Sequence, residues 1–100
     1  MIKVEIVKEN TNYKKITLLG HALYADYGKD IVCSAVSSIV ITTVNGILSL
    51  NKDNQDYKSY ESKFVLNIKS TDQVVQKLIE NMVNLLKELS EKYPKNIKVK

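Results

Sequence analysis

The stretch that decides the fold is residues 31–50, IVCSAVSSIVITTVNGILSL, which contains no charged residue. Its length meets the criterion for a membrane-spanning helix. Seven of its residues are nevertheless polar, and at 100° per residue six of the seven lie on one stripe, with Thr43 as the exception. We therefore interpret the stretch as a helix of a soluble protein, with a narrow polar face and a wide apolar face, rather than as a membrane span.

Alternating apolar and polar residues on either side of this helix predict two β-hairpins. The first pairs residues 2–8 with residues 13–20, and Asn and Thr residues between them supply a turn. The second pairs residues 57–60 with residues 63–69. Each hairpin has one apolar face, so each is expected to cover part of a common core.

A second helix is predicted over residues 71–92, where apolar residues recur at helical spacing. Ser70 and Gln73 match the pattern of a capping box, and Pro94 is expected to end the helix. The apolar residues at positions 97 and 99 predict a final short strand.

Length and composition indicate one globular domain that covers residues 1–100. The element order ββαββαβ predicts an α+β fold, a two-layer sandwich with two helices packed on a mostly antiparallel or mixed sheet. One cysteine and one histidine exclude an intramolecular disulfide and a four-ligand zinc site, and we expect no metal and no cofactor.

Charge and targeting features indicate the kind of partner. All 15 basic residues are lysine, so the chain lacks the forked donors that recognise phosphate or guanine. Direct nucleic-acid binding is therefore not expected. We recognise no signal peptide at the amino end and expect a cytoplasmic protein without a membrane partner.

The helix at residues 31–50 carries more apolar surface than one face of a sheet can cover. The surplus requires a second partner, which is either the helix at residues 71–92 or the same helix of another subunit. From this surplus we expect a homodimer. The residues that require this second partner are Val40, Val44 and Ile47.

Cys33 and His21 are the candidates for chemistry. With Asp30 as the N-cap, Cys33 lies in the first turn of its helix, where backbone N–H groups lack helical acceptors and the dipole is positive. A thiol in such a position can have its pKa lowered to about 3.5–7.5, and an imidazole can carry its proton to a leaving amine. The spacing permits a Cys–His pair but also permits a buried, inert cysteine and a solvated histidine.

The sequence around these residues resembles the ribosomal-processing cysteine protease family, Prp. The matching motifs are G-H-A at residues 20–22, A-D-Y-G-K-D-I-V-C at residues 25–33 and C-x-x-x-S at residues 33–37. The resemblance covers the whole chain, because members of that family are ββαββαβ proteins of about this length.

This resemblance implies removal of an N-terminal extension from a large-subunit ribosomal protein, a step of ribosome maturation, by a homodimeric enzyme. By position, Cys33 matches the nucleophile and His21 the general base, while Asp30 and Ser37 match accessory, orienting positions. The residues that match the family's loop over the substrate groove are Gly20, Ala22, Tyr24, Asp26, Tyr27 and Gly28.

Two other hypotheses belong to different classes. One is a non-catalytic ribosome- or RNA-associated α+β dimer, favoured by the net charge of +4 and the pI of about 9.1. The other is a structural dimer with no catalytic role. For an RNA binder, salt should weaken binding steeply and Cys33→Ala should be harmless, whereas a protease predicts the reverse.

Overall fold

The computed structural model describes residues 1–20 and 31–100, and their elements follow the predicted order. The elements are β1 (Ile2–Glu9), β2 (Asn12–Leu19), α1 (Ile31–Leu50), the single-turn helix η1 (Lys52–Asn54), β3 (Gln55–Ser59), β4 (Lys63–Ile68), α2 (Gln73–Lys92) and β5 (Ile97–Val99).

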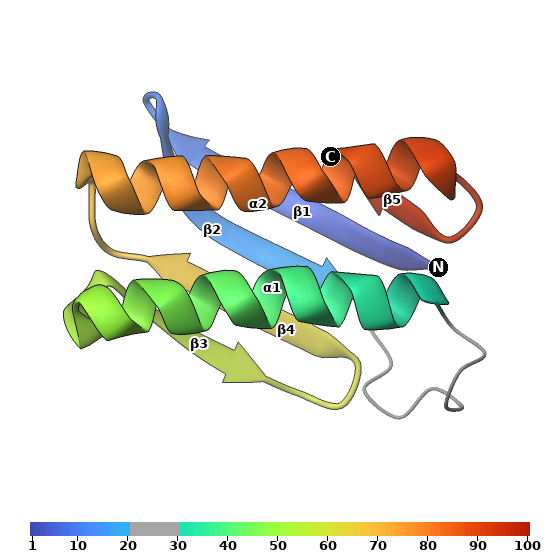
Figure 1. The fold of residues 1–100 in the computed structure, drawn as a ribbon, viewed down its shortest axis with the longest axis horizontal. Helices are drawn as coiled ribbons and strands as arrows, with labels where there is room; N and C mark the ends of the chain where they lie inside the picture. Colours follow the sequence, from blue (N-terminus) through green and yellow to red (C-terminus); the bar gives the residue numbers. More distant parts are fainter. Residues whose placement is uncertain (21–30) are drawn as a thin grey trace.

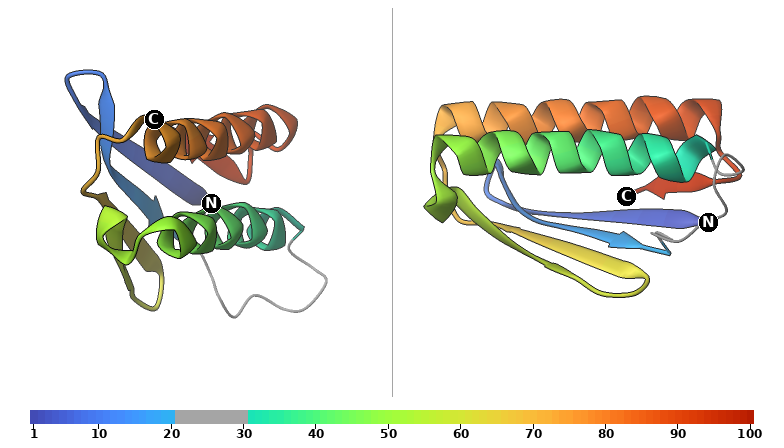
Figure 2. Two further views of the ribbon diagram at one scale, coloured as in Figure 1. Left: turned by 60° about the vertical axis from the view of Figure 1, so that its left-hand side comes forward. Right: turned by 60° about the horizontal axis from the view of Figure 1, so that its bottom comes forward.

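The strands of the described residues form one mixed sheet in the order β3-β4-β2-β1-β5. β5 runs parallel to β1, and every other neighbouring pair is antiparallel. Both helices lie side by side on the same face of this sheet (Figures 1 and 2). The predicted α+β two-layer sandwich is therefore confirmed.

α1 buries one stripe of its surface in the core between the helices and the sheet. The residues that the sequence left in need of a second partner, Val40, Val44 and Ile47, are all buried within the chain, and α1 packs along α2. The first of the two predicted alternatives, the helix at residues 71–92, is thus the one that the structure provides. Because these residues are already buried within one chain, they give no reason to expect a second subunit against this stripe.

By length and composition alone, α1 is also a helix that could cross a membrane. Its packing supports the other interpretation, because its apolar stripe lies against the sheet and α2 while its exposed face is largely polar. The polar residues exposed on that face are Ser34, Ser38, Thr42, Asn45 and Ser49.

The amino end of α2 differs from the prediction. Asp72 is the N-cap, and its Oδ1 accepts hydrogen bonds from the backbone N–H groups of Val74 (2.9 Å) and Val75 (3.3 Å). The predicted capping box was wrong, because Ser70 lies before the cap and its Oγ accepts a hydrogen bond from the Asp72 N–H. A charged carboxylate at the positive end of a helix is the stronger acceptor of the two side chains.

Candidate active site

Cys33 is the third residue of α1, so it lies in the first turn of the helix as predicted. Backbone N–H groups in that turn have no helical acceptor and can bind a negatively charged oxygen. The Cys33 side chain is only 5% exposed and belongs to the hydrophobic core, although Ile31 and Ser34 beside it are exposed. Cys33 is therefore a buried residue at the amino end of α1.

Most of the other predicted site residues lie outside the described residues. The N-cap role of Asp30 and the pairing of His21 with Cys33 stay predictions for this reason. The predicted site residues in this group are His21, Ala22, Tyr24, Asp26, Tyr27, Gly28 and Asp30.

Gly20 follows β2 directly and precedes His21 in the sequence. Its φ of +78° is in the left-handed region, which side chains with a Cβ disfavour. A Cβ built on Gly20 would lie 2.5 Å from the carbonyl oxygen of Met1, and the Gly20 N–H donates to the Ser62 carbonyl at 2.9 Å. Only glycine fits this point, where the chain leaves the sheet next to the predicted base.

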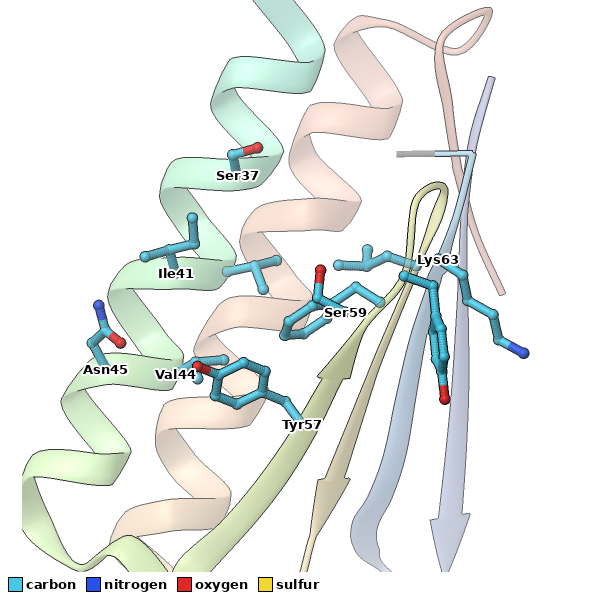
Figure 3. A pocket seen from close by; sticks show the side chains of 11 residues that line it. Ser37, Ile41, Val44, Asn45, Tyr57, Ser59 and Lys63 are labelled. Atoms are coloured by element: carbon cyan, nitrogen blue, oxygen red, sulfur yellow. The ribbon is translucent and has the colours of Figure 1, made fainter. Parts of the chain in front are cut away.

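Ser37 lies one turn after Cys33, is partly buried, and lines a cavity of about 310 Å³ between α1 and the β3–β4 hairpin (Figure 3). Ser37, Ile41 and Asn45 come from successive turns of α1 and form a continuous stripe along one side of the cavity. The other lining residues are Leu18, Val40, Val44, Tyr57, Ser59, Tyr60, Lys63 and Phe64.

The register of β3 explains why its side chains form the opposite wall. Gln55 is buried on the helix side of the sheet, where its Nε2 donates to the Val44 carbonyl of α1 at 2.8 Å. Side chains alternate along a strand, so Tyr57 and Ser59 face the same side as Gln55. The Tyr57 ring stacks on that of Phe64, with ring centroids 5.5 Å apart and an interplanar angle of 24°. One wall of the cavity is therefore aromatic.

The residues that line this cavity include one charged side chain, that of Lys63. Asp56, between Gln55 and Tyr57, lies on the other face of β3 by strand alternation. The Asn67 side-chain amide donates a hydrogen bond to the Asp56 carboxylate at 3.1 Å, and the Lys69 ammonium lies 3.1 Å from the same carboxylate. Both interactions lower the pKa of Asp56. The cavity is thus apolar and largely uncharged.

The sequence did not predict this cavity. The sequence predicts a strand at residues 57–60, but nothing in its pattern indicates which helix this strand faces. Within residues 1–20 and 31–100, no three His, Cys, Asp or Glu side chains gather in a way that could hold a metal ion. The described part of the site therefore offers a thiol, first-turn N–H groups and an apolar cavity one helical turn away.

Comparison with known proteins relates this arrangement to a protease family. The family model described as cysteine protease Prp matches residues 1–98. A relative from Staphylococcus aureus, the ribosomal processing cysteine protease Prp, is 29% identical over 103 aligned residues, which cover 99% of this chain and 97% of the relative. The protein of the same name from Mycoplasma genitalium is 30% identical over 102 residues, covering 92% of each chain.

Two solved structures have the same fold. The structure of S. aureus Prp in complex with a substrate peptide has a TM-score of 0.87 and 27% identity, covering 100% of this chain and 98% of that one. The structure of S. aureus Prp with a covalently linked product peptide also has a TM-score of 0.87, at 27% identity, and covers 99% of this chain and 97% of that one. The similarity therefore extends over the whole of both folds.

Proposed function

Because the chain belongs to the Prp family of cysteine proteases, we propose that it removes the N-terminal extension of a large-subunit ribosomal protein during ribosome maturation. The observation that carries this proposal is the position of Cys33. It is the one cysteine of a chain that belongs to a cysteine protease family, and it lies in the first turn of α1. An apolar cavity that could receive part of a peptide begins one turn further along the same helix.

In the proposed mechanism, the Cys33 thiolate attacks the carbonyl carbon of the scissile bond and forms a tetrahedral intermediate. N–H groups of the first turn of α1 stabilise its oxyanion. His21 takes the thiol proton and delivers it to the leaving amine as the C–N bond breaks, which leaves an acyl-enzyme. Water, deprotonated by His21, then attacks the thioester and releases the second product with the thiol restored.

The burial of Cys33 adds a requirement to this mechanism. Attack needs the sulfur within about 3–3.5 Å of the carbonyl carbon. A side chain that is only 5% exposed cannot be approached that closely until the side chains that cover it move. Substrate binding must therefore uncover the thiol, and binding energy from the rest of the peptide would supply the free energy for this step.

A peptide cleavage assay tests the proposed function. The purified chain is incubated near pH 7 with a peptide that spans the junction between the extension and the mature ribosomal protein. We expect hydrolysis at one bond, detected by mass spectrometry of both products, and no hydrolysis of a scrambled peptide of the same composition. An intact junction peptide after prolonged incubation with folded protein would contradict the proposal.

The proposed function also places the chain in the cytoplasm, where ribosomes are assembled. The RNA-associated alternative is supported only by the net charge of +4. The exposed face of α1 is uncharged and the adjoining cavity is apolar, and these surfaces suit a peptide better than a phosphate backbone.

We further propose that the chain forms a homodimer through α2. Three apolar side chains of α2 stay exposed in the single chain and share one face of the helix at i, i+4 and i+11 spacing; they are Val74, Leu78 and Leu85. Sedimentation velocity at micromolar concentration should give the mass of a dimer, and Leu85→Glu should shift it to the monomer. A monomer for the parent chain would overturn this proposal.

A further inference from the structure

We propose that the face of the sheet opposite the two helices binds the sugar-phosphate backbone of RNA, without sequence preference. This inference rests on the proposed function in one respect: a ribosomal protein as substrate brings the enzyme close to RNA. It goes further by assigning a second surface, apart from the catalytic thiol, and by naming the chemistry of the partner that this surface binds.

Strand register identifies the side chains that point away from both helices, up to the register shift after Val7 of β1; we call this surface the open face (Figure 2). Val4, Leu18 and Leu66 are buried between the sheet and the helices, so their neighbours along each strand point to the open face. The Lys100 N–H donates to the Val4 carbonyl at 2.8 Å, which continues the ladder beyond β5. The lysines of the open face, all of them exposed, are Lys3, Lys15, Lys58, Lys69, Lys98 and Lys100.

The formal charge of the protein is concentrated on the open face. Among the described residues, the carboxylates of this face are those of Glu5 and Asp56, so its six lysines give it a formal charge of +4. Lys63 alternates onto the same side but borders the cavity beside α1, and it is not counted. The helix layer adds no net charge, because α1 has no charged residue and α2 has three lysines and three glutamates. Since the net charge of the whole chain is also +4, a polyanion is attracted to the open face.

Two lysines of the open face lie opposite each other on neighbouring strands. Lys3 of β1 pairs in register with Lys98 of β5, and neighbouring strands are only about 4.8 Å apart. Like charges in facing positions repel each other. A phosphate group between the two ammonium groups replaces this repulsion with attraction, and lysine binds phosphate as a point charge without a guanidinium fork. The expectation of no nucleic-acid binding rested on the lack of arginine and does not cover contacts of this kind.

Other occupants fit the open face less well. A second copy of the chain would bring two positively charged faces together. A lipid surface binds a protein firmly only when apolar side chains or a lipid anchor also insert, and the side chains at the centre of the open face, Thr17 and Val65, are short and half-buried. RNA needs no insertion, because the contacts are made by the phosphates of its backbone.

Fluorescence anisotropy with a short, labelled, single-stranded RNA of mixed sequence tests this inference. The parent chain is titrated at salt concentrations from about 50 to 200 mM. Contacts between lysine and phosphate release counterions, so the logarithm of the association constant should fall linearly with the logarithm of the salt concentration. If about four phosphates are contacted, the slope should be about −3. A scrambled RNA of the same composition should bind equally well.

A pair of lysine substitutions locates the binding surface. In the variant with Lys3→Gln and Lys98→Gln, the magnitude of the salt slope should fall by about one per lysine, and binding at low salt should weaken about tenfold per lysine. The matched control carries Lys77→Gln and Lys87→Gln, which remove the same charge from exposed positions of α2. The control should bind RNA within about twofold of the parent, because its substitutions lie in the helix layer.

Cleavage of the free junction peptide separates this inference from the proposed function. The variant with Lys3→Gln and Lys98→Gln should cleave the free peptide at the parental rate, because both side chains point away from the helix layer that contains Cys33. If the parent cleaves the peptide but does not bind RNA, or if both lysine pairs weaken RNA binding equally, the RNA surface is wrong and the protease stands.

Two further outcomes are decisive. If RNA binding depends on Lys3 and Lys98 while the junction peptide stays intact, the proposed function fails and the RNA surface stands. If the parent binds vesicles that contain phosphatidylserine more tightly than RNA at the same salt concentration, the open face is a membrane surface and the inference is overturned.

Discussion

Replacement of Cys33 by alanine is expected to lower the rate of junction-peptide cleavage by at least about 10³-fold. The variant has no nucleophile, so any residual rate comes only from peptide binding and from the N–H groups of the first turn of α1. Loss of one buried sulfur atom should cost stability on the order of 1 kcal/mol, so the variant should still fold. Initial rates from chromatography of the products, together with circular dichroism spectra, measure both effects.

The matched control for this variant is Ser34→Ala. Ser34 is the next residue of the same helical turn and is exposed, so its replacement changes the turn without removing the proposed nucleophile. It should cleave the peptide at nearly the parental rate. If the cleavage rate of Cys33→Ala is within tenfold of the parental rate, Cys33 is not the nucleophile. Its thiol is then only a buried core side chain.

Replacement of Gly20 by alanine is expected to destabilise the protein by about 2–5 kcal/mol. The added Cβ would lie 2.5 Å from the Met1 carbonyl oxygen, a backbone atom that cannot rotate away, and the φ of +78° is itself unfavourable for alanine. Denaturation with urea measures the change in the free energy of unfolding. The cleavage rate should fall as well, because Gly20 directly precedes the proposed base, His21, in the sequence.

The control for Gly20→Ala is Gly46→Ala, which is expected to change the stability in the opposite direction. Gly46 lies within α1, and a Cβ built on it meets nothing within 4 Å apart from its chain neighbours and the nearby backbone of its own helix. Gly46→Ala should therefore stabilise the protein by about 0.5–1 kcal/mol, since alanine has the higher helix propensity. Equal stability of Gly20→Ala and the parent would mean that the contact with Met1 does not constrain the chain.

The elements of the fold were predictable because their periodicity is strong. The uncharged stretch at residues 31–50 forms α1 over the same residues, and the strands agree with their predicted ranges to within about two residues at each end. The cap of α2 was not predicted, because Ser70, Thr71 and Asp72 all offer side-chain oxygens close to the start of the helix. The carboxylate is the acceptor that the first-turn N–H groups use.

The candidate site was predictable only in part. The sequence predicted that Cys33 lies in a first turn, but its burial depends on how α1 packs against the sheet and α2. The cavity depends on the contact between α1 and the β3–β4 hairpin, which no local pattern encodes. The surplus of apolar residues on α1 was recognised, yet the partner that covers Val40, Val44 and Ile47 within the chain could be identified only from the fold.

The burial of Cys33 has a consequence for how fast peroxide can inactivate the enzyme. Peroxide converts accessible thiolates to sulfenic acid and then, irreversibly, to sulfinic and sulfonic acids. The rate follows exposure, and Cys33 is only 5% exposed. A catalytic thiol that is buried in the absence of substrate should therefore be oxidised more slowly by peroxide than a solvent-exposed one.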